Sequence, residues 1–228
     1  MGSDLAPALG IMLVSVAFFG GLTAFVASPF EQMASVPADG RGLNPLLQSF
    51  WMISHPVMLY LGFVGFSVPF AVAGGSLLVR RKGHEWIEWT RRWTLTAWLA
   101  LSMGMVLGSR WAYEELGWGG YWAWDPVENA SLMPWLTATA FIHSVMVQER
   151  RGMLKRWNVA LVALTYFLSI FGTFITRSGI LSSVHTFVES EIGPLFLGFL
   201  GLIAAGSLYL IKTRNPSNRT PRVSSASS

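Results

Sequence analysis

Residues 117–135, GWGGYWAWDPVENASLMPW, concentrate large flat side chains in a stretch too rich in glycine to form one ordinary helix. The tryptophans are Trp118, Trp122, Trp124 and Trp135, and Trp111 precedes them. The glycines allow non-helical backbone and the close approach of another flat object. Such an aromatic platform suits a flat, apolar ligand with charged edges, and a porphyrin is the best candidate. A quinone, a lipid headgroup or a plain aromatic belt at a membrane surface is the alternative.

Two arginines and two histidines are candidates for the polar contacts of such a ligand. Arg110 and Arg177 can pair with propionate groups, because a guanidinium meets a carboxylate in a forked geometry. Imidazole is a usual iron ligand. His55, in SHPVMLYLGF, and His185, in SGILSSVHTF, could coordinate one iron from opposite faces. The alternative is that each is a polar residue at a helix end.

The other two histidines differ in their surroundings. His143, in TAFIHSVMV, lies well inside an apolar run, where an ionisable side chain is costly and is a functional hypothesis by default. It is either a metal ligand or a hydrogen-bonded structural residue. His84 lies in the basic stretch RRKGHEW and is interpreted as a solvated residue.

The segment Asp125-Pro126-Val127-Glu128 has the pattern of a helix start. Asp125 suits the N-cap, Pro126 the first helical position, and Glu128 the third position of a capping box. This structural role explains both carboxylates without catalysis. The cap would fix where the next helix begins and where Trp122 and Trp124 lie.

The composition predicts an all-α polytopic membrane protein. The chain is 52% hydrophobic, only 12% of its 228 residues are charged, and it has no cysteine. Each of its apolar runs approaches the roughly 17–25 residues that a membrane-spanning helix needs. We identify about six transmembrane helices: Leu5–Ala27, Pro56–Val79, Trp93–Ser109, Ala130–Gln148, Trp157–Ile175 and Pro194–Ile211.

The basic residues predict the orientation of these spans. Thirteen of the 16 lysines and arginines lie in the connections after spans two and four and after span six. The positive-inside rule places these connections in the cytoplasm. Both termini are then cytoplasmic, and the tryptophan-rich loop lies on the periplasmic side of a bacterial-type inner membrane. We expect one transmembrane domain, residues 1–211, with the loop at 110–135, and a disordered cytoplasmic tail, residues 212–228.

Four separate blocks of sequence resemble one family. WGGYWAWDPVENASLMPWL is similar to the WWD motif of the CcmF-type cytochrome c haem lyases. The other blocks are HPVMLYLGFVGFSVPFA around His55, FIHSVMVQERRG around His143 and GTFITRSGILSSVHTF around His185. The resemblance runs from about Asn44 to about Phe187.

The resemblance implies that His55 and His185 hold an incoming haem b beside the WWD platform. It implies that His143 is one axial ligand of a second, resident b-type haem. The candidate cofactor-binding residues are Trp118, Trp122, Trp124, Asp125, Trp135, Arg110 and Arg177, and no separate catalytic residue is assigned.

The resemblance also implies a place in cytochrome c maturation. The haem chaperone CcmE delivers the haem, and CcmH helps to present the apocytochrome c. Thioether bonds then form between the haem vinyl groups and the cysteines of the apocytochrome. The surrounding partner is membrane lipid, and no nucleic acid is expected.

Members of this family are usually more than twice as long as this chain, and no histidine follows His185 here. We therefore expect a partner chain to complete the lyase, or the sequence to be part of a longer one. The alternatives are a CcmC-like protein that exports haem and loads it onto CcmE, and a non-catalytic haem-binding assembly subunit of a split lyase.

Overall fold

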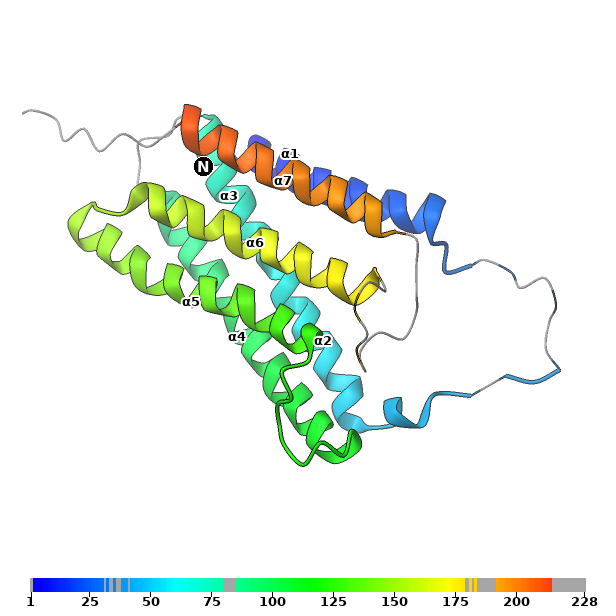
Figure 1. Cartoon of the computed structure of the whole chain (residues 1–228). Helices are drawn as coiled ribbons and strands as arrows, with labels where there is room; N and C mark the ends of the chain where they lie inside the picture. Colours follow the sequence, from blue (N-terminus) through cyan, green and yellow to red (C-terminus); the bar gives the residue numbers. More distant parts are fainter. Residues whose placement is uncertain are drawn as a thin grey trace, which may run out of the picture.

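A computed structural model of the chain describes residues 2–30, 32, 35, 38–40, 42–79, 85–178, 181, 183 and 192–214. These residues form helices and contain no β-strand, as the sequence predicts. The α-helices are α1 (Gly2–Gly21), α2 (Phe50–Gly65), α3 (Ser67–Leu78), α4 (Glu85–Glu115), α5 (Pro126–Arg151), α6 (Lys155–Arg177) and α7 (Gly193–Thr213), labelled in Figure 1. A π-helical turn, Leu22–Val26, continues α1, and a 3₁₀ turn, Pro45–Leu47, precedes α2.

All six predicted apolar runs lie on helices, and five helical segments are long and apolar enough to cross a membrane. These segments are Leu5–Val26, Phe50–Leu78, Pro126–Arg151, Lys155–Arg177 and Gly193–Thr213. The second span is longer than predicted, because α2 begins at Phe50 and Pro56 lies inside it. The third predicted run lies on α4, which is not among the five because it is less apolar.

Helix α4 extends beyond the predicted run, Trp93–Ser109, at both ends. Ion pairs one helical turn apart support both extensions: Arg92 contacts Glu88 at 2.7 Å, and Arg110 contacts Glu114 at 2.7 Å. The irregular connection between α4 and α5 therefore comprises only residues 116–125, which is shorter than the predicted loop, 110–135.

Helices α2 and α4 pack antiparallel at very short range. A Cβ added to Gly62 would lie 2.6 Å from the Cβ of Leu101, and one added to Gly104 would lie 2.7 Å from the backbone nitrogen of Leu59. Small residues let helix backbones approach closely in this way, which is common in membrane proteins. Helix α4 therefore lies directly beside α2, which belongs to one of the five segments that are apolar enough to cross a membrane.

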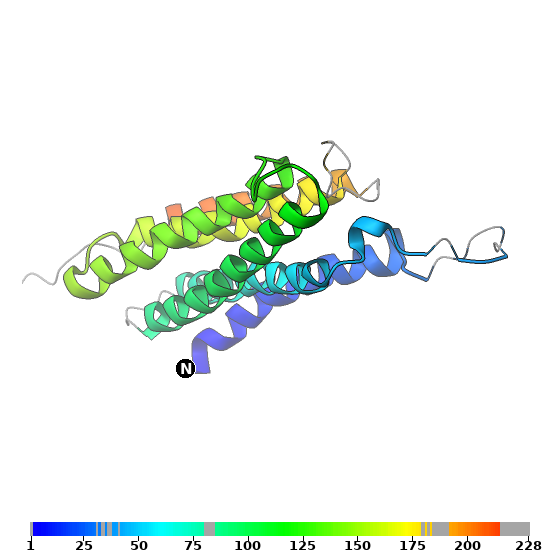
Figure 2. The same cartoon turned by 90° about the horizontal axis from the view of Figure 1, so that it is seen from below.

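The elements of the predicted site all lie at one end of the bundle. In Figure 1 the start of α2 and the connection between α4 and α5 lie together at the bottom, and the end of α6 lies above them. In Figure 2, α4 runs from the neighbourhood of α3 towards the start of α5. Phe18 near the end of α1 stacks on Phe199 near the start of α7, with ring centroids 4.1 Å apart, so these two helices are antiparallel.

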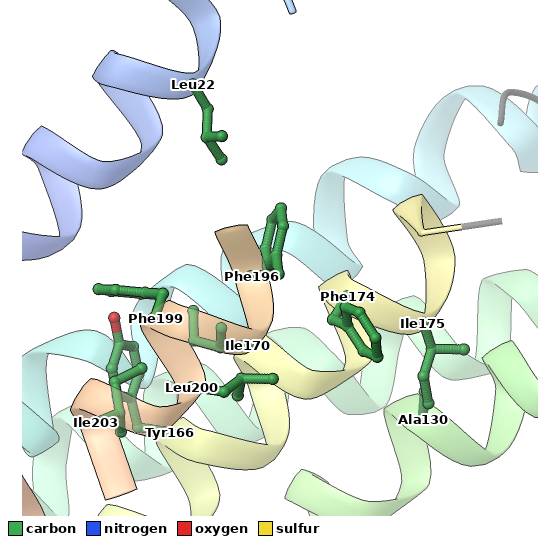
Figure 3. Packing of buried hydrophobic residues seen from close by; sticks show 10 residues of the cluster. All are labelled: Leu22, Ala130, Tyr166, Ile170, Phe174, Ile175, Phe196, Phe199, Leu200 and Ile203. Carbon is green, nitrogen blue, oxygen red and sulfur yellow. The ribbon is translucent and has the colours of Figure 1, made fainter. Parts of the chain in front are cut away.

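A hydrophobic cluster joins α6 and α7 to the end of α1 and to the start of α5 (Figure 3). Phe174, Phe196 and Leu200 lie at its centre, and Ala130 of α5 and Leu22 border it. A Cβ added to Gly172 would lie 3.2 Å from the carbonyl oxygen of Ala130, so α5 and α6 approach closely there. This contact fixes the end of α6 that carries Arg177.

Polar side chains also connect α5 and α6. Asn158 donates a hydrogen bond from Nδ2 to Oε1 of Gln148 over 2.6 Å, and both residues are almost fully buried. Thr165 donates to Thr137 over 2.8 Å. A buried polar group with a hydrogen-bond partner is tolerated, whereas one that loses its partner lowers the stability of the fold.

We predict that Asn158→Leu lowers the free energy of unfolding by about 1–3 kcal/mol, because the buried amide of Gln148 loses its donor. Unfolding of the purified chain in detergent, followed by tryptophan fluorescence, measures this difference.

The matched control is Gln148→Met combined with Asn158→Leu, which replaces both polar partners with apolar groups. This pair should recover most of the lost stability. A double variant as unstable as the single one would show that side-chain volume, not the lost hydrogen bond, is responsible.

Candidate functional site

A cleft of about 230 Å³ opens between α2, α5 and α6 at the end of the bundle that carries the tryptophan loop. Helix α2 contributes His55 and apolar neighbours, α5 contributes Val127 and Ala130, and α6 contributes Arg177. The cleft extends inward to Phe63 and Gly172. The structure therefore places a predicted iron ligand and a predicted propionate partner in one apolar space.

The imidazole of His55 is held from one side by α4. Its Nδ1 lies 2.6 Å from the carbonyl oxygen of Gly104. A carbonyl oxygen only accepts hydrogen bonds, so Nδ1 carries the proton and the lone pair lies on Nε2. This is the arrangement found in metal-binding histidines, whose second ring nitrogen is oriented by a hydrogen bond.

The capping box predicted at Asp125 is confirmed. Asp125 Oδ1 accepts a hydrogen bond from the backbone N–H of Val127 over 2.9 Å. The carboxylate of Glu128 accepts from the backbone N–H groups of Asp125 and Ala123, each over 3.1 Å. Because Val127 also lines the cleft, the cap connects the tryptophan loop rigidly to the wall of the site.

Asp125 has a second function in the structure. Ser183 donates from Oγ to Asp125 Oδ1 over 2.7 Å, although 58 residues separate them in sequence. Ser183, which follows α6 in the sequence, therefore contacts the start of α5. His185, predicted as an iron ligand, lies outside the described residues.

Three of the predicted tryptophans lie on the connection between α4 and α5. Trp122 and Trp124 meet edge to face, with ring centroids 6.2 Å apart, and Trp124 is 69% exposed. Trp124 has a backbone φ of 59°, an unusual conformation that the adjacent cap supports. The indole N–H of Trp122 is buried and has no acceptor among the described residues, whereas Trp118 is half-buried.

Trp135 and Trp111 lie apart from that group. Trp135 is inside α5, where it stacks on Trp98 of α4 at 5.5 Å and donates to Ser102 over 2.8 Å. Trp111 is 0% exposed and donates to the carbonyl oxygen of Leu46 over 2.8 Å. Both make helix-packing contacts, so the sequence grouped five tryptophans that the structure places in different environments.

The two predicted arginines also differ in position. Arg177 lines the cleft with His55. Arg110 pairs with Glu114 and lies over the ring of Trp51, with 5.9 Å from its guanidinium carbon to the ring centroid. Trp51 in turn donates to Glu114 over 2.6 Å. Arg110 therefore belongs to a separate cluster at the ends of α2 and α4.

His143 lies on an exposed face of α5, away from the cleft. Its Nδ1 lies 2.8 Å from the carbonyl oxygen of Thr139, so this histidine also carries its lone pair on Nε2. Leu136 and Met146 are exposed on the same helix. No group of three or more histidine and carboxylate side chains suited to a metal occurs within the described part of the chain.

Residues 5–181 match the family model described as cytochrome C assembly protein. The chain belongs to this family. The cytochrome c-type biogenesis protein CcmF of Pseudomonas aeruginosa is 51% identical over 93% of this chain and 33% of its own length. CcmF of Escherichia coli K12 is 48% identical over 97% of this chain and 34% of its own length.

A solved structure titled "Cytochrome c Heme Lyase CcmF" has a similar fold, with a TM-score of 0.75 and 44% sequence identity. The match covers 93% of this chain and 32% of that one. The chain thus spans about a third of the length of the curated relatives it matches. With its apolar helices, it is a multi-pass membrane protein of the cytochrome c assembly family.

Sequence reasoning missed two contacts, one beside the ring of His55 and one that attaches the tryptophan loop. Gly104 accepts the hydrogen bond of His55 and Gly108 lies against its ring, and the signal was available as the G-x-x-x-G pattern GMVLG within an apolar run. The stack of Tyr113 on Tyr121, with centroids 4.4 Å apart, attaches the tryptophan loop to α4. No local pattern marks this second contact.

We predict that Asp125→Ala destabilises the chain by about 0.5–2 kcal/mol, because α5 loses its N-cap oxygen. The variant also removes the acceptor for Ser183, so the loop at 116–125 should become more sensitive to limited proteolysis. Both effects can be measured on the purified chain in detergent.

Asp125→Asn is the matched control, because asparagine keeps an oxygen that can cap the helix. It should retain most of the stability and protection. Equal losses in both variants would show that the negative charge matters and that the capping oxygen does not.

Proposed function

We propose that this chain forms the haem-binding part of a CcmF-type cytochrome c haem lyase and acts in cytochrome c maturation. The observation that carries the proposal is the cleft that joins His55 and Arg177 beside the capped tryptophan loop. The family match supports the same process. The substrate is haem b, and the site lies at the periplasmic face of a bacterial inner membrane.

The residues of the cleft fit haem as a substrate. His55 would bind iron through Nε2, because Nδ1 donates to the carbonyl of Gly104. Arg177 offers a guanidinium to a propionate. The hydroxyls of Thr173 and Thr176 already donate to carbonyls of α6, so the walls between these groups are largely apolar.

His185 is proposed as the ligand on the opposite face of the iron. Ser183 is two residues before it in sequence and bonds to Asp125 beside the tryptophan loop. Trp118, Trp122 and Trp124 then provide the aromatic surface next to the haem. Arg110 and Trp135 take supporting roles in this proposal, because their partners are Glu114 and Ser102.

The contribution of these residues to the reaction is positioning. Two axial bonds and aromatic packing would hold the haem edge still while cysteine thiols of the apocytochrome add to its vinyl groups. Fixing two reactants in this way makes a bimolecular addition effectively unimolecular. CcmE is the proposed donor of haem, and CcmH and apocytochrome c are the proposed partners on the product side.

His143 is proposed as one axial ligand of a resident b-type haem, which would supply electrons that keep the substrate iron reduced. The imidazole is exposed on α5 and is presented with Nδ1 protonated. The other axial ligand would come from outside these 228 residues, on the same polypeptide or on a partner chain that completes the lyase.

We predict that the purified wild-type chain binds haem with the spectrum of a histidine-ligated iron. His55→Ala combined with His185→Ala should lose this spectrum, and His143→Ala alone should keep it. Oxidised and reduced absorption spectra in mild detergent measure both results.

Haem that survives the double variant would contradict the proposed site. The lyase assignment has its own test in a bacterium that carries this gene. Deletion of the gene should abolish holocytochrome c, and undiminished holocytochrome c would refute the assignment.

We predict that Arg177→Gln weakens binding of ferric protoporphyrin IX about 10- to 100-fold, because a charge-assisted hydrogen bond contributes about 1.5–3 kcal/mol. Arg110→Gln, the matched control, should have a much smaller effect because Arg110 does not line the cleft. A fluorescence-quenching titration measures both affinities.

The dimethyl ester of the same porphyrin lacks free propionates, so it should bind wild type and Arg177→Gln with similar affinity. A larger loss for Arg110→Gln than for Arg177→Gln would assign the propionate contact to the cluster on α4.

A further inference from the structure

The imidazole of His55 occupies space that exists only because Gly108 has no side chain. A Cβ added to Gly108 would lie 2.5 Å from Cε1, 2.6 Å from Nδ1 and 3.1 Å from Nε2 of His55. Contacts under about 3 Å cannot be accommodated without movement of one partner. The ring edge formed by Nδ1 and Cε1 therefore lies against the backbone of α4.

We propose that Gly108 is a positioning residue for His55: with the carbonyl of Gly104, it holds the ring with Nδ1 protonated, so that iron would be bound through Nε2. The inference rests on the proposed function of His55 as a haem ligand. It adds the requirement that position 108 of α4 has no side chain, which is separate from the identity of the iron ligands.

Gly108 differs from the other glycines between α2 and α4 in what it faces. A Cβ on Gly62 would meet the backbone of Leu101 at 2.8 Å, and one on Gly104 would meet the backbone of Leu59 at 2.7 Å. Those two positions determine how closely the helices pack. At Gly108 all three nearest atoms belong to the imidazole of His55.

This difference determines what a methyl group at position 108 would do. None of the three atoms nearest to such a methyl group belongs to the backbone of α2, so the ring of His55 is what must rotate or shift. Its hydrogen bond to Gly104 spans only 2.6 Å, so a small rotation breaks it. The proton is then no longer held on Nδ1, and Nε2 loses its fixed direction.

The test uses the full 228-residue chain in detergent, with ¹⁵N-labelled histidine and ferric protoporphyrin IX as the probe. Histidine ¹⁵N shifts report which ring nitrogen carries the proton, and His55→Gln identifies the signal of His55. We expect wild type to show the Nδ1–H tautomer, and Gly108→Ala to lose it and to bind the porphyrin about 10- to 100-fold more weakly.

Two matched glycine variants separate orientation from packing. Gly62→Ala introduces a clash in the same helix pair away from His55, and Gly198→Ala adds a methyl group where nothing lies within 4 Å. Both should keep the tautomer of His55. Loss of the tautomer and of binding in Gly62→Ala to the same extent as in Gly108→Ala would overturn the proposal, because helix packing would then explain both.

Wild-type affinity and tautomer in Gly108→Ala would also overturn it. If the ¹⁵N spectrum of the wild-type chain shows the proton of His55 on Nε2, this result alone overturns the proposal. It does not require that Gly108→Ala accumulate. A wild-type chain with the Nδ1–H tautomer that binds no porphyrin would refute the proposed function and leave the orientation of His55 by Gly108 supported.

Discussion

The close packing of α2 against α4 is the contact on which the rest of the site depends. Gly104 lets the two backbones approach beside Leu59, and this proximity brings its carbonyl within reach of His55. The same pairing aligns the outer ends of the helices, where Trp51 bonds to Glu114. A wider separation at Gly104 would break the hydrogen bond that orients the histidine.

The second constraint is the capping box at the start of α5. It determines the register in which the chain leaves the irregular connection and enters a helix, and it places Val127 in the wall of the cleft. The exposed indole of Trp124 is thereby held on a short segment between two rigid helices. This arrangement leaves a flat side chain accessible while its backbone is fixed, which is what a binding surface for a flat ligand requires.

The parts of the structure that depend on local sequence were predictable. The all-helical architecture follows from apolar runs, and the cap at Asp125 follows from four consecutive residues. The extent of α4 was underestimated, because ion pairs such as Arg92–Glu88 continue the helix beyond its apolar residues. The different surroundings of Arg110 and Arg177 were not predictable, since they depend on which helices become neighbours.

Thr139 on α5 bonds both to His143 and to α4, the helix that also bonds to His55. Its hydroxyl oxygen accepts from the indole of Trp98 on α4, and its carbonyl accepts from His143 one turn further along α5. Six residues beyond Trp98, on the same α4, Gly104 accepts from His55. Both imidazoles therefore lie close to α4 in the hydrogen-bond network: His55 bonds to it directly, and the residue that accepts from His143 is itself bonded to Trp98.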